Sequence, residues 1–271
     1  MPASALALAL GSAVLHAAWN LLLGRARDVQ AAAAATFLLS IALAAPFAAV
    51  WWHADASVWP YALASAFCEA VYIVALAYAY RTGEVSFVYP LTRGLPPVLS
   101  LGVAVAFLGH GATAAEAAGV LLVAVGIVLV RGPGGQADAR GLLLVATIGA
   151  AIAAYTLLDR VGIHRAGALT YFVLVLVGPS LVYPALVGWQ PIRRELGLGV
   201  AAAAVANLGS FALGLLALRR GAAAPVLAVR SSSIVFATLL AGRVLAENVP
   251  PGRLAGSVLV FGGVVLLAVP A

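Results

Sequence analysis

The sequence predicts an all-α integral membrane protein with ten transmembrane helices, arranged as two five-helix repeats of inverted topology. The first observation is composition: 64% of the 271 residues are hydrophobic and 9% are charged, whereas soluble domains have about 25% charged residues. The second is that apolar runs recur at the length of a spanning helix, about 20 residues. The third is that the two halves of the chain match in register. Together these observations exclude a soluble single domain.

The apolar runs give the expected spans, which are separated by short polar breaks. In the first half they cover residues 4–23, 31–52, 58–80, 85–108 and 114–130. A Gly- and Pro-rich break at residues 131–140, RGPGGQADAR, follows. In the second half the runs cover residues 141–158, 166–188, 196–218, 222–240 and 253–269. Because Gly and Pro interrupt regular structure, this break divides the chain into a first repeat, 1–135, and a second, 136–271.

A shift of 136 to 138 residues aligns the two halves. It pairs, in order along the chain, Trp19 with Tyr155, Glu69 with Asn207, Arg93 with Arg230, Gly119 with Gly256, and Gly126 with Gly263. Because each half has an odd number of spans, the second half must enter the membrane from the opposite side, which gives inverted-topology repeats. This architecture is typical of secondary transporters.

Ionisable and amide side chains at mid-depth sort the spans. They are His16 in the first span, Glu69 in the third, Arg93 in the fourth, Asn207 in the eighth and Arg230 in the ninth. A charge that faces hydrocarbon is costly, so such residues face the bundle interior. We therefore expect the first, third, fourth, sixth, eighth and ninth spans to line one polar cavity. The second, fifth, seventh and tenth spans would face lipid or a partner.

The two intramembrane arginines, Arg93 and Arg230, are the main candidates for ligand recognition. Arg93 lies about 12 Å inside its span, counted at about 1.5 Å per residue, and Arg230 lies at a similar depth. An arginine at the centre of a span costs about 2.5 to 3.5 kcal/mol on translocon scales. Either each arginine is structural, with Glu69 neutralising one of them, or the pair clamps an anionic group. We favour the clamp, because two arginines face one buried acid and the cavity is then net positive.

Helix-breaking residues accompany both arginines. Pro90 and Pro96 flank Arg93, and Pro225 precedes Arg230 by five residues. Proline frees backbone carbonyls and lets a helix bend. Broken spans at matching positions of two repeats are typical of a midplane binding site.

Glu69 is the only acid that we expect at mid-helix depth. It is interpreted either as a site for a coupling proton or an amine, or as a constant ion pair with an arginine. His16 is interpreted as a proton relay or as a hydrogen-bonding residue between helices. Further candidates for substrate binding are Trp19, Asn20, Tyr72, Tyr89, Tyr155, Asn207 and Ser231. For the aromatic members the alternative is core packing, and for the amides it is hydrogen bonding between helices.

Signatures of catalysis and of nucleic-acid binding are absent from the sequence. It has no HExxH, no GxxxxGK loop and no GxSxG, and its four histidines lie far apart. All 15 basic residues are arginines, and the net charge of +6 in a membrane chain mainly sets loop orientation. The single cysteine, Cys68, allows neither an intrachain disulfide nor a Cys-rich metal site. We expect no enzyme activity, no cofactor and no nucleic-acid partner.

Three motifs resemble those of a known family. They are HAAWN at residues 16–20, VYPLTRG at 88–94 and VRSSSIVFA at 229–237. With ten helices in two inverted units, they make essentially the whole chain similar to the EamA family of the drug/metabolite transporter superfamily. The resemblance is to a branch in which some members are associated with phosphonate utilisation, and in which Glu often stands where this chain has Ser231. It implies alternating access around a cavity between the repeats, in a monomer or dimer.

These observations predict a secondary active transporter that exports or exchanges a small anionic or zwitterionic metabolite. Its partners would be the substrate, the lipid bilayer and a coupling proton, and it would act as a monomer or homodimer. One alternative is a flippase for a lipid-linked phosphate, which would need a lateral opening to lipid beside Arg93. A less favoured alternative is an intramembrane enzyme, which would need His16 and Glu69 within reach of one substrate atom.

Basic residues in the connections predict a multi-pass protein of the cell (inner) membrane with both termini outside the cytoplasm. The connections after odd-numbered spans hold Arg25, Arg27, Arg81, Arg131, Arg140, Arg193, Arg194, Arg243 and Arg253. Those after even-numbered spans hold Arg160, Arg165, Arg219 and Arg220. Arginine-rich connections stay in the cytoplasm. The family resemblance implies the opposite orientation.

Overall fold

The computed structural model describes residues 2–82, 92, 94–96, 98, 99, 102, 113–131, 139–221, 223–245 and 248–267. Its helices are α1 (Ala3–Gly24), α2 (Val29–Val50), α3 (Trp59–Thr82), α5 (Ala114–Arg131), α6 (Ala139–Gly162), α7 (Ala168–Val187), α8 (Trp189–Glu195), α9 (Leu198–Arg220), α10 (Ala223–Arg230), α11 (Ser233–Val244) and α12 (Pro251–Leu267). A short 3-10 helix, η1 (Ala56–Val58), precedes α3. Most of the fourth expected span, with Arg93 and Tyr89, lies outside the described residues.

Helices account for the fold class. The described ranges contain no strand, and seven helical segments in them, with α10 and α11 counted as one, are long and apolar enough to cross a membrane. Two more, α5 and α12, are apolar but shorter. The prediction of an all-α architecture is therefore confirmed, and these helices fit a multi-pass membrane protein.

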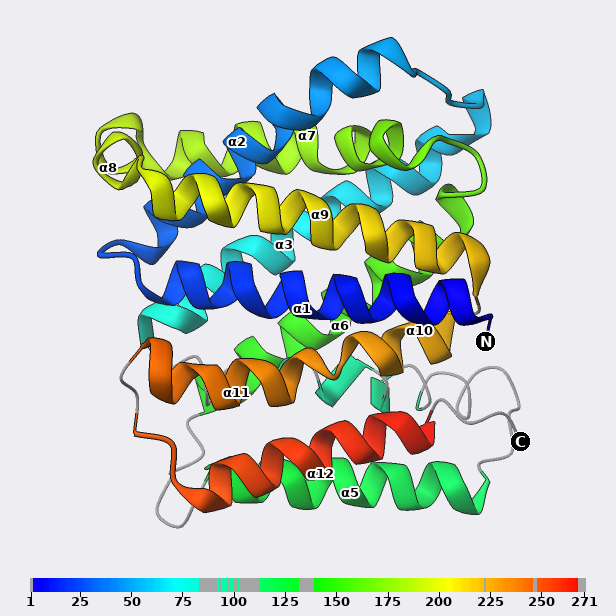
Figure 1. Ribbon diagram of the computed structural model, residues 1–271, viewed down its shortest axis with the longest axis vertical. Helices are drawn as coiled ribbons and strands as arrows, with labels where there is room; N and C mark the ends of the chain where they lie inside the picture. Colours follow the sequence, from blue (N-terminus) through cyan, green and yellow to red (C-terminus); the bar gives the residue numbers. More distant parts are fainter. Residues whose placement is uncertain are drawn as a thin grey trace.

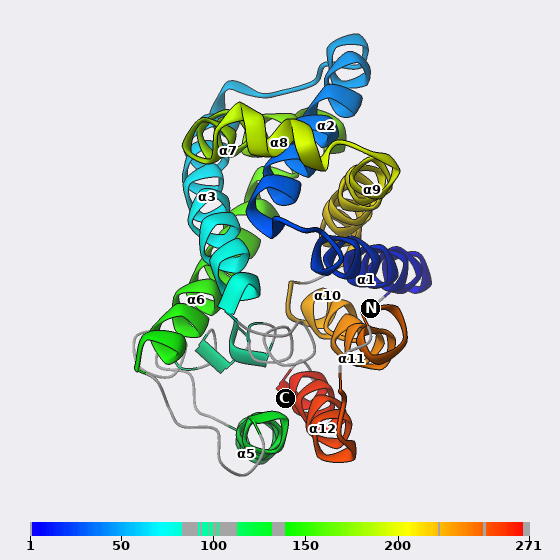
Figure 2. The same cartoon turned by 90° about the vertical axis from the view of Figure 1, so that its left-hand side faces the viewer.

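The helices run side by side and alternate in direction (Figure 1). α1 begins and α12 ends on the same side of the bundle, whereas the short α8 lies on the opposite side. The view turned by 90° places α5 and α12 at one end of the molecule and α2 and α7 toward the other (Figure 2). The middle of the bundle is therefore formed by α1, α3, α6, α9 and α10.

Local sequence signals fix where several helices begin and end. The Asp28 carboxylate accepts hydrogen bonds from the amides two and three residues on, at 3.0 and 3.1 Å, which starts α2. At the start of α5, the Thr113 amide donates to the Glu116 carboxylate at 2.8 Å and the Glu116 amide donates to the Thr113 hydroxyl at 3.2 Å. This reciprocal pair is a capping box. Gly188, with φ of 90°, ends α7 and turns the chain into α8.

Helices of the first half pack against helices of the second half. The main pairs are α1 with α9, α2 with α7, α3 with α6, and α5 with α12. Small side chains allow the close approach: Ala5, Ala9, Ala13 and Ala17, four residues apart on α1, are each at most 1% exposed. In a bilayer, where the lipid is as apolar as the protein, such close packing supplies much of the association energy.

Glycines form the contact between α5 and α12. A β-carbon on Gly126 would lie 2.6 Å from the carbonyl oxygen of Gly256, and one on Gly256 would lie 2.5 Å from that of Gly126. Gly119 and Gly263 oppose each other in the same way, at 2.9 and 2.6 Å. A larger residue at any of these positions would force the two backbones apart.

The ninth expected span is broken directly after Arg230. α10 ends there, Ser231 and Ser232 form a turn, and α11 follows. The amides of both serines bond carbonyls three residues earlier at 3.1 Å, and the Ser231 hydroxyl donates to the carbonyl four residues earlier at 2.9 Å. From the sequence, Pro225 is the residue predicted to let this span bend. Pro225 itself lies in the first turn of α10, where proline is tolerated, and the break that the structure shows lies at Ser231 and Ser232, whose side chains compete for the backbone.

Two connections meet on the side where α1 begins. These connections, which we call the loop clasp, are residues 53–57 and 163–167. The Asp55 amide donates to the Arg165 carbonyl at 2.8 Å, and the Gly167 amide donates to the His53 carbonyl at 2.9 Å. These backbone hydrogen bonds join the start of α3 to the turn between α6 and α7.

Side chains add to the loop clasp. Hydrogen bonds from Ser57, and then the positive charge of Arg165, hold the pKa of Asp55 below its usual value, so this carboxylate stays ionised. Arg165 Nε donates to the Ser57 hydroxyl at 3.1 Å, and its guanidinium lies 4.5 Å from the centre of the Tyr61 ring. The loop clasp therefore joins the two halves on this side of the bundle.

The glycine contact makes a prediction about stability. Gly263→Ala would place a methyl group 2.6 Å from a backbone oxygen, and such overpacking costs about 1 to 3 kcal/mol. We expect a lower Tm for this variant in thermal unfolding of the purified protein. Gly262→Ala is the matched control, because nothing lies within 4 Å of a β-carbon at that position. Equal Tm values for the two variants would contradict the close contact of α5 and α12.

Candidate functional site

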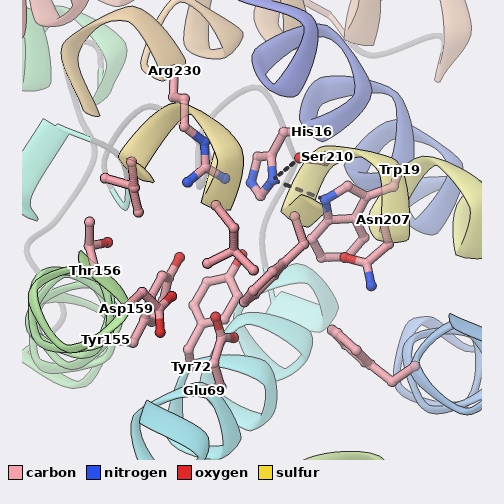
Figure 3. Close-up of a pocket in the computed structure, with 14 residues that line it drawn as sticks. His16, Trp19, Glu69, Tyr72, Tyr155, Thr156, Asp159, Asn207, Ser210 and Arg230 are labelled. Atoms are coloured by element: carbon pink, nitrogen blue, oxygen red, sulfur yellow. Dashed lines mark hydrogen bonds between the residues drawn. The ribbon is translucent and has the colours of Figure 1, made fainter. Parts of the chain in front are cut away.

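A cavity lies between α1, α3, α6, α9 and α10 (Figure 3). Its empty space, including the part open to solvent, is about 490 Å³. The polar residues that line it are His16, Glu69, Thr156, Asp159, Asn207, Ser210 and Arg230. The aromatic ones are Trp19, Phe37, Tyr72, Tyr155 and Phe211. Within the described ranges, no group of three or more His, Cys, Asp or Glu side chains is placed to hold a metal ion.

One side of the cavity presents hydrogen-bond donors from His16 and Arg230, and we call it the donor wall. Trp19 Nε1 donates to His16 Nδ1 at 3.1 Å. Because an indole N–H can only donate, Nδ1 is the acceptor, and the proton of the neutral imidazole is on Nε2. Figure 3 shows this second ring nitrogen turned away from Trp19, toward Arg230. The donor wall therefore combines a guanidinium with an imidazole N–H.

α9 holds the donor wall in place. The Ser12 hydroxyl donates to the Ser210 carbonyl at 2.7 Å, and the Ser210 hydroxyl donates to the Ser12 carbonyl at 3.0 Å. This pair locks α1 to α9 one turn before His16. Gly214, one turn after Ser210, leaves room for the guanidinium, because a β-carbon there would lie 3.1 Å from Arg230 Cζ. The hydrogen-bonded pair of Ser12 and Ser210, and the absence of a side chain at Gly214, thus position the side chains of the donor wall.

The opposite side of the cavity carries two carboxylates, Glu69 on α3 and Asp159 on α6, and we call it the acid wall. Each of these residues is 3% exposed. Asp159 Oδ1 accepts hydrogen bonds from the Ser65 hydroxyl at 2.6 Å and from the Tyr171 hydroxyl at 3.0 Å. Figure 3 shows the acid wall across the cavity from the donor wall. The two walls therefore separate negative from positive groups.

Aromatic rings fill the space beside the two walls. The rings of Tyr72 and Tyr155 lie with their centres 5.8 Å apart at an angle of 61°. They come from α3 and α6, the helices that also carry the acid wall. Trp19 meets Phe37 edge to face, with ring centres 6.1 Å apart. Ring faces next to carboxylates suit the binding of a cation.

Most candidate residues from the sequence lie together. Those that line the cavity are His16, Trp19, Glu69, Tyr72, Tyr155, Asn207 and Arg230. Ser231 lines an adjoining cavity of about 350 Å³, which shares His16 and Arg230 with the first. Asn20 does not line either cavity; it is buried, and its side-chain amide donates to the His16 carbonyl at 2.8 Å. Arg93 and Tyr89 lie outside the described residues.

Asp159 is a second acid at the cavity, which was not identified from the sequence. Glu69 was the only acid expected at mid-helix depth, because the sixth apolar run ends one residue before Asp159. α6 instead continues to Gly162, so that Asp159 is inside the helix. The available signal was its position four residues after Tyr155, on the same helix face. Among the described lining residues two acids therefore lie opposite Arg230, whereas the predicted net positive cavity also counts Arg93, which lies outside the described residues, and so it stays a prediction.

The predicted set of cavity helices is confirmed in part. α1, α3, α6, α9 and α10 line the cavity as expected. The sequence assigns the second and seventh spans to lipid or a partner, but Phe37 of α2 lines the cavity and Tyr171 of α7 is buried against Asp159. Composition could not separate these cases, because side chains that face lipid are as apolar as those that pack on protein.

Comparisons with known proteins inform the fold alone. No family model matches the sequence, and no curated protein matches it. Among solved structures, a crystal structure of a protein is similar to this chain with a TM-score of 0.69 and 17% sequence identity. The match covers 98% of this chain and 96% of the other. The fold is therefore shared over nearly the whole length, at an identity that carries no statement about activity.

Proposed function

We propose that this chain is a secondary active transporter that carries a small zwitterionic metabolite across the inner membrane by alternating access. The observation that carries the proposal is the central cavity, with Arg230 and His16 on one wall and Glu69 and Asp159 on the other. The cavity lies within a bundle of apolar helices. Ionisable groups at such a position are a functional site by default.

A zwitterion satisfies both walls at once. Its anionic group would accept hydrogen bonds from the planar guanidinium of Arg230, which matches a carboxylate or phosphonate in a two-pronged geometry. Its ammonium group would lie at the acid wall, near the faces of Tyr72 and Tyr155. A plain anion brings no positive charge to Glu69 and Asp159, and a plain cation brings no negative charge to Arg230, so each of them interacts favourably with one wall only. Of the anionic or zwitterionic substrates that the sequence predicts, the second carboxylate therefore favours the zwitterions.

Inverted repeats of residues 1–135 and 136–271 are the second part of the proposal, and helix pairing supports them. In the alignment of the two halves, α1, α2, α3 and α5 correspond to α6, α7, α9 and α12. The pair α1–α9 then maps onto α6–α3, whereas α2–α7 and α5–α12 each map onto themselves. The contact of Gly126 with Gly256 likewise maps onto that of Gly263 with Gly119. Such exchange is the property of a two-fold axis in the membrane plane.

Alternating access needs two ends that open in turn around a fixed site. The loop clasp supports this mechanism, since it joins the two halves on one side of the bundle with a small set of hydrogen bonds. The turn at Ser231 and Ser232 supports it as well, because it lets α10, which carries Arg230, move relative to α11. Discontinuous helices beside the binding site are typical of secondary transporters.

We also propose that the chain is a member of the EamA family, on the motifs at residues 16–20, 88–94 and 229–237. Arg93 is then the second arginine of the substrate site, as the counterpart of Arg230 in the first half. A coupling proton and a monomer or homodimer are part of the same proposal. The link of some relatives to phosphonate utilisation makes aminophosphonates one class of probe.

Membrane orientation is proposed from the arginine count, which places both termini outside the cytoplasm. The common side on which α1 begins and α12 ends supports a common side for the termini (Figure 1). Alkaline phosphatase fused to the C-terminus should therefore be active in intact cells, because that enzyme matures only outside the cytoplasm. A fusion after Asp28, in the first connection, is the control and should be inactive. The reverse pattern of activities would contradict the charge-based orientation.

Ligand stabilisation tests the proposed function. A ligand that binds the folded state raises its stability, by about 2.7 kcal/mol at a concentration of 100 Kd. We expect β-alanine or 2-aminoethylphosphonate to raise the Tm of the purified protein. Propionate, ethylphosphonate and ethylamine each lack one of the two charges and should raise it less at equal concentration. Equal stabilisation by propionate and β-alanine, or stabilisation by dicarboxylates alone, would overturn the zwitterion assignment.

Arg230→Lys tests the donor wall with the best zwitterion from this series. Lysine keeps the charge but loses the planar fork, so the Kd should rise about tenfold or more while the protein still folds. Arg219→Lys is the matched control, because Arg219 is exposed at the end of α9, and its Kd should equal that of the wild type. Unchanged affinity in Arg230→Lys would leave Arg230 as a structural group.

A further inference from the structure

We propose that Asp159 binds the coupling proton, and that this proton and the ammonium group of the substrate occupy Asp159 in turn. The inference rests on the proposed function, because it names the group that couples that transport to a proton gradient. From sequence alone, the candidates for this role are Glu69 and His16. The geometry around Asp159 points to a different residue.

Asp159 is a buried carboxyl group with neutral hydrogen-bonding partners. It is 3% exposed, and its hydrogen bonds come from the hydroxyls of Ser65 on α3 and Tyr171 on α7. In the part of the chain that the structure describes, no cationic side chain hydrogen-bonds to it, and Arg230 acts on it only through space. A buried carboxylate in such surroundings is costly unless a proton or a cation compensates its charge.

Several charged or titratable side chains line the same cavity as Asp159 or lie on the helices that pack against it. They are Cys68 and Glu69 on α3, Tyr155 on α6, Tyr171 on α7, His16 on α1 and Arg230 on α10. Glu69 repels an ionised Asp159, whereas Arg230 attracts it. When the anionic group of a ligand binds at the donor wall, it neutralises the positive charge of Arg230. The negative charge of the acid wall must then be compensated by a proton or by the ammonium group of the ligand.

The two hydroxyl donors bond the same oxygen of Asp159, Oδ1. A proton on Oδ2 therefore converts the carboxylate into the acid without breaking either hydrogen bond, since Oδ1 remains an acceptor. His16 differs, because its Nδ1 accepts from Trp19 and a proton there would break that bond. Asp159 can therefore be ionised or protonated without any change in its hydrogen bonds to Ser65 and Tyr171.

The exchange of proton for substrate balances in charge and in atoms. The O–H bond of the Asp159 acid breaks, and its proton passes to water in the open cavity. The carboxylate then accepts N–H hydrogen bonds from the ammonium group of the substrate. One proton leaves for each substrate that binds, and one returns when the substrate leaves on the other side. The transporter is therefore a proton antiporter.

Asp159 lies beside the loop clasp, which connects proton binding to the opening of that side. α3, with Ser65, and α7, with Tyr171, begin just after the two clasp segments, and Asp159 comes four residues before the second segment. The hydrogen bonds of Asp159 thus join the three helices whose ends form the clasp. A ligand whose ammonium group hydrogen-bonds to Asp159 therefore acts directly on the place where α3, α6 and α7 are joined.

Proton release on ligand binding tests the inference. β-Alanine is the probe, because its own groups do not titrate near neutral pH. Purified protein in weakly buffered detergent with a pH indicator should release about one proton for each β-alanine bound. Asp159→Asn should release none, and its β-alanine affinity should lose its pH dependence. Asp159→Glu keeps the carboxyl group and should restore release, and Glu69→Gln should bind more weakly but still release the proton.

Release that persists in Asp159→Asn, or that is lost in Glu69→Gln and not in Asp159→Asn, would overturn the proposal.

A second measurement needs no variant and no ligand. A hydrophobic carbodiimide reacts with protonated carboxyl groups in membranes, and mass spectrometry of the wild-type protein should find the adduct on Asp159 at low pH and not at high pH. An adduct on Glu69 instead, or one independent of pH, would overturn it. Failure of every zwitterion to bind contradicts the transport function, and this labelling still reports on Asp159.

Discussion

Charged side chains buried among apolar helices are the constraint on which the rest of this structure depends. Arg230, Glu69 and Asp159 lie on different helices, and none of them can face hydrocarbon without a large cost. α3, α6 and α10 must therefore turn these side chains toward one interior space. That requirement fixes the rotation of each helix and places the cavity between them. Helices without such groups are free to form the periphery, as α5 and α12 do.

A polar cavity inside a bundle of apolar helices requires contacts between the helices that do not depend on the hydrophobic effect of water. Lipid offers no hydrophobic drive for helices to associate, so close packing of small residues supplies the attraction. The alanine stripe of α1 and the paired glycines of α5 and α12 bring backbones together. The reciprocal hydrogen bonds of Ser12 and Ser210 add specificity where α1 meets α9. The one described span that departs from this regular packing, α10 to α11, is the one that carries Arg230.

The sequence predicted the helices well because apolar runs and capping residues act locally. The first run, 4–23, corresponds to α1 at Ala3–Gly24, and the fifth, 114–130, to α5 at Ala114–Arg131. The sixth run ended at residue 158 because a charged residue normally marks the edge of a span. Burial of Asp159 depends on hydroxyls from α3 and α7, which no local pattern contains. The same limit applies to the loop clasp, whose hydrogen bonds join segments more than a hundred residues apart.

The site could be predicted from the sequence where the spacing of residues on one helix face determines it. It could not be predicted where contacts with neighbouring side chains determine it. His16 and Trp19 lie three residues apart, so a shared face was predictable. That Trp19 donates to Nδ1, which puts the proton of the neutral ring on Nε2, follows only from the positions of both rings. Asn20 looked equivalent by spacing, yet its amide is used within α1. The room for the Arg230 guanidinium depends on Gly214 of α9, which the sequence of α10 cannot reveal.

The measurement that bears most directly on these conclusions is a structure of the protein with 2-aminoethylphosphonate bound, because phosphorus distinguishes the two ends of that ligand in the density. We expect the phosphonate within hydrogen-bond distance of Arg230 and His16, and the ammonium group between Glu69 and Asp159, inside the central cavity. Ligand density in the reverse orientation, or at the lipid-facing surface of the bundle, would contradict the division of the cavity into a donor wall and an acid wall.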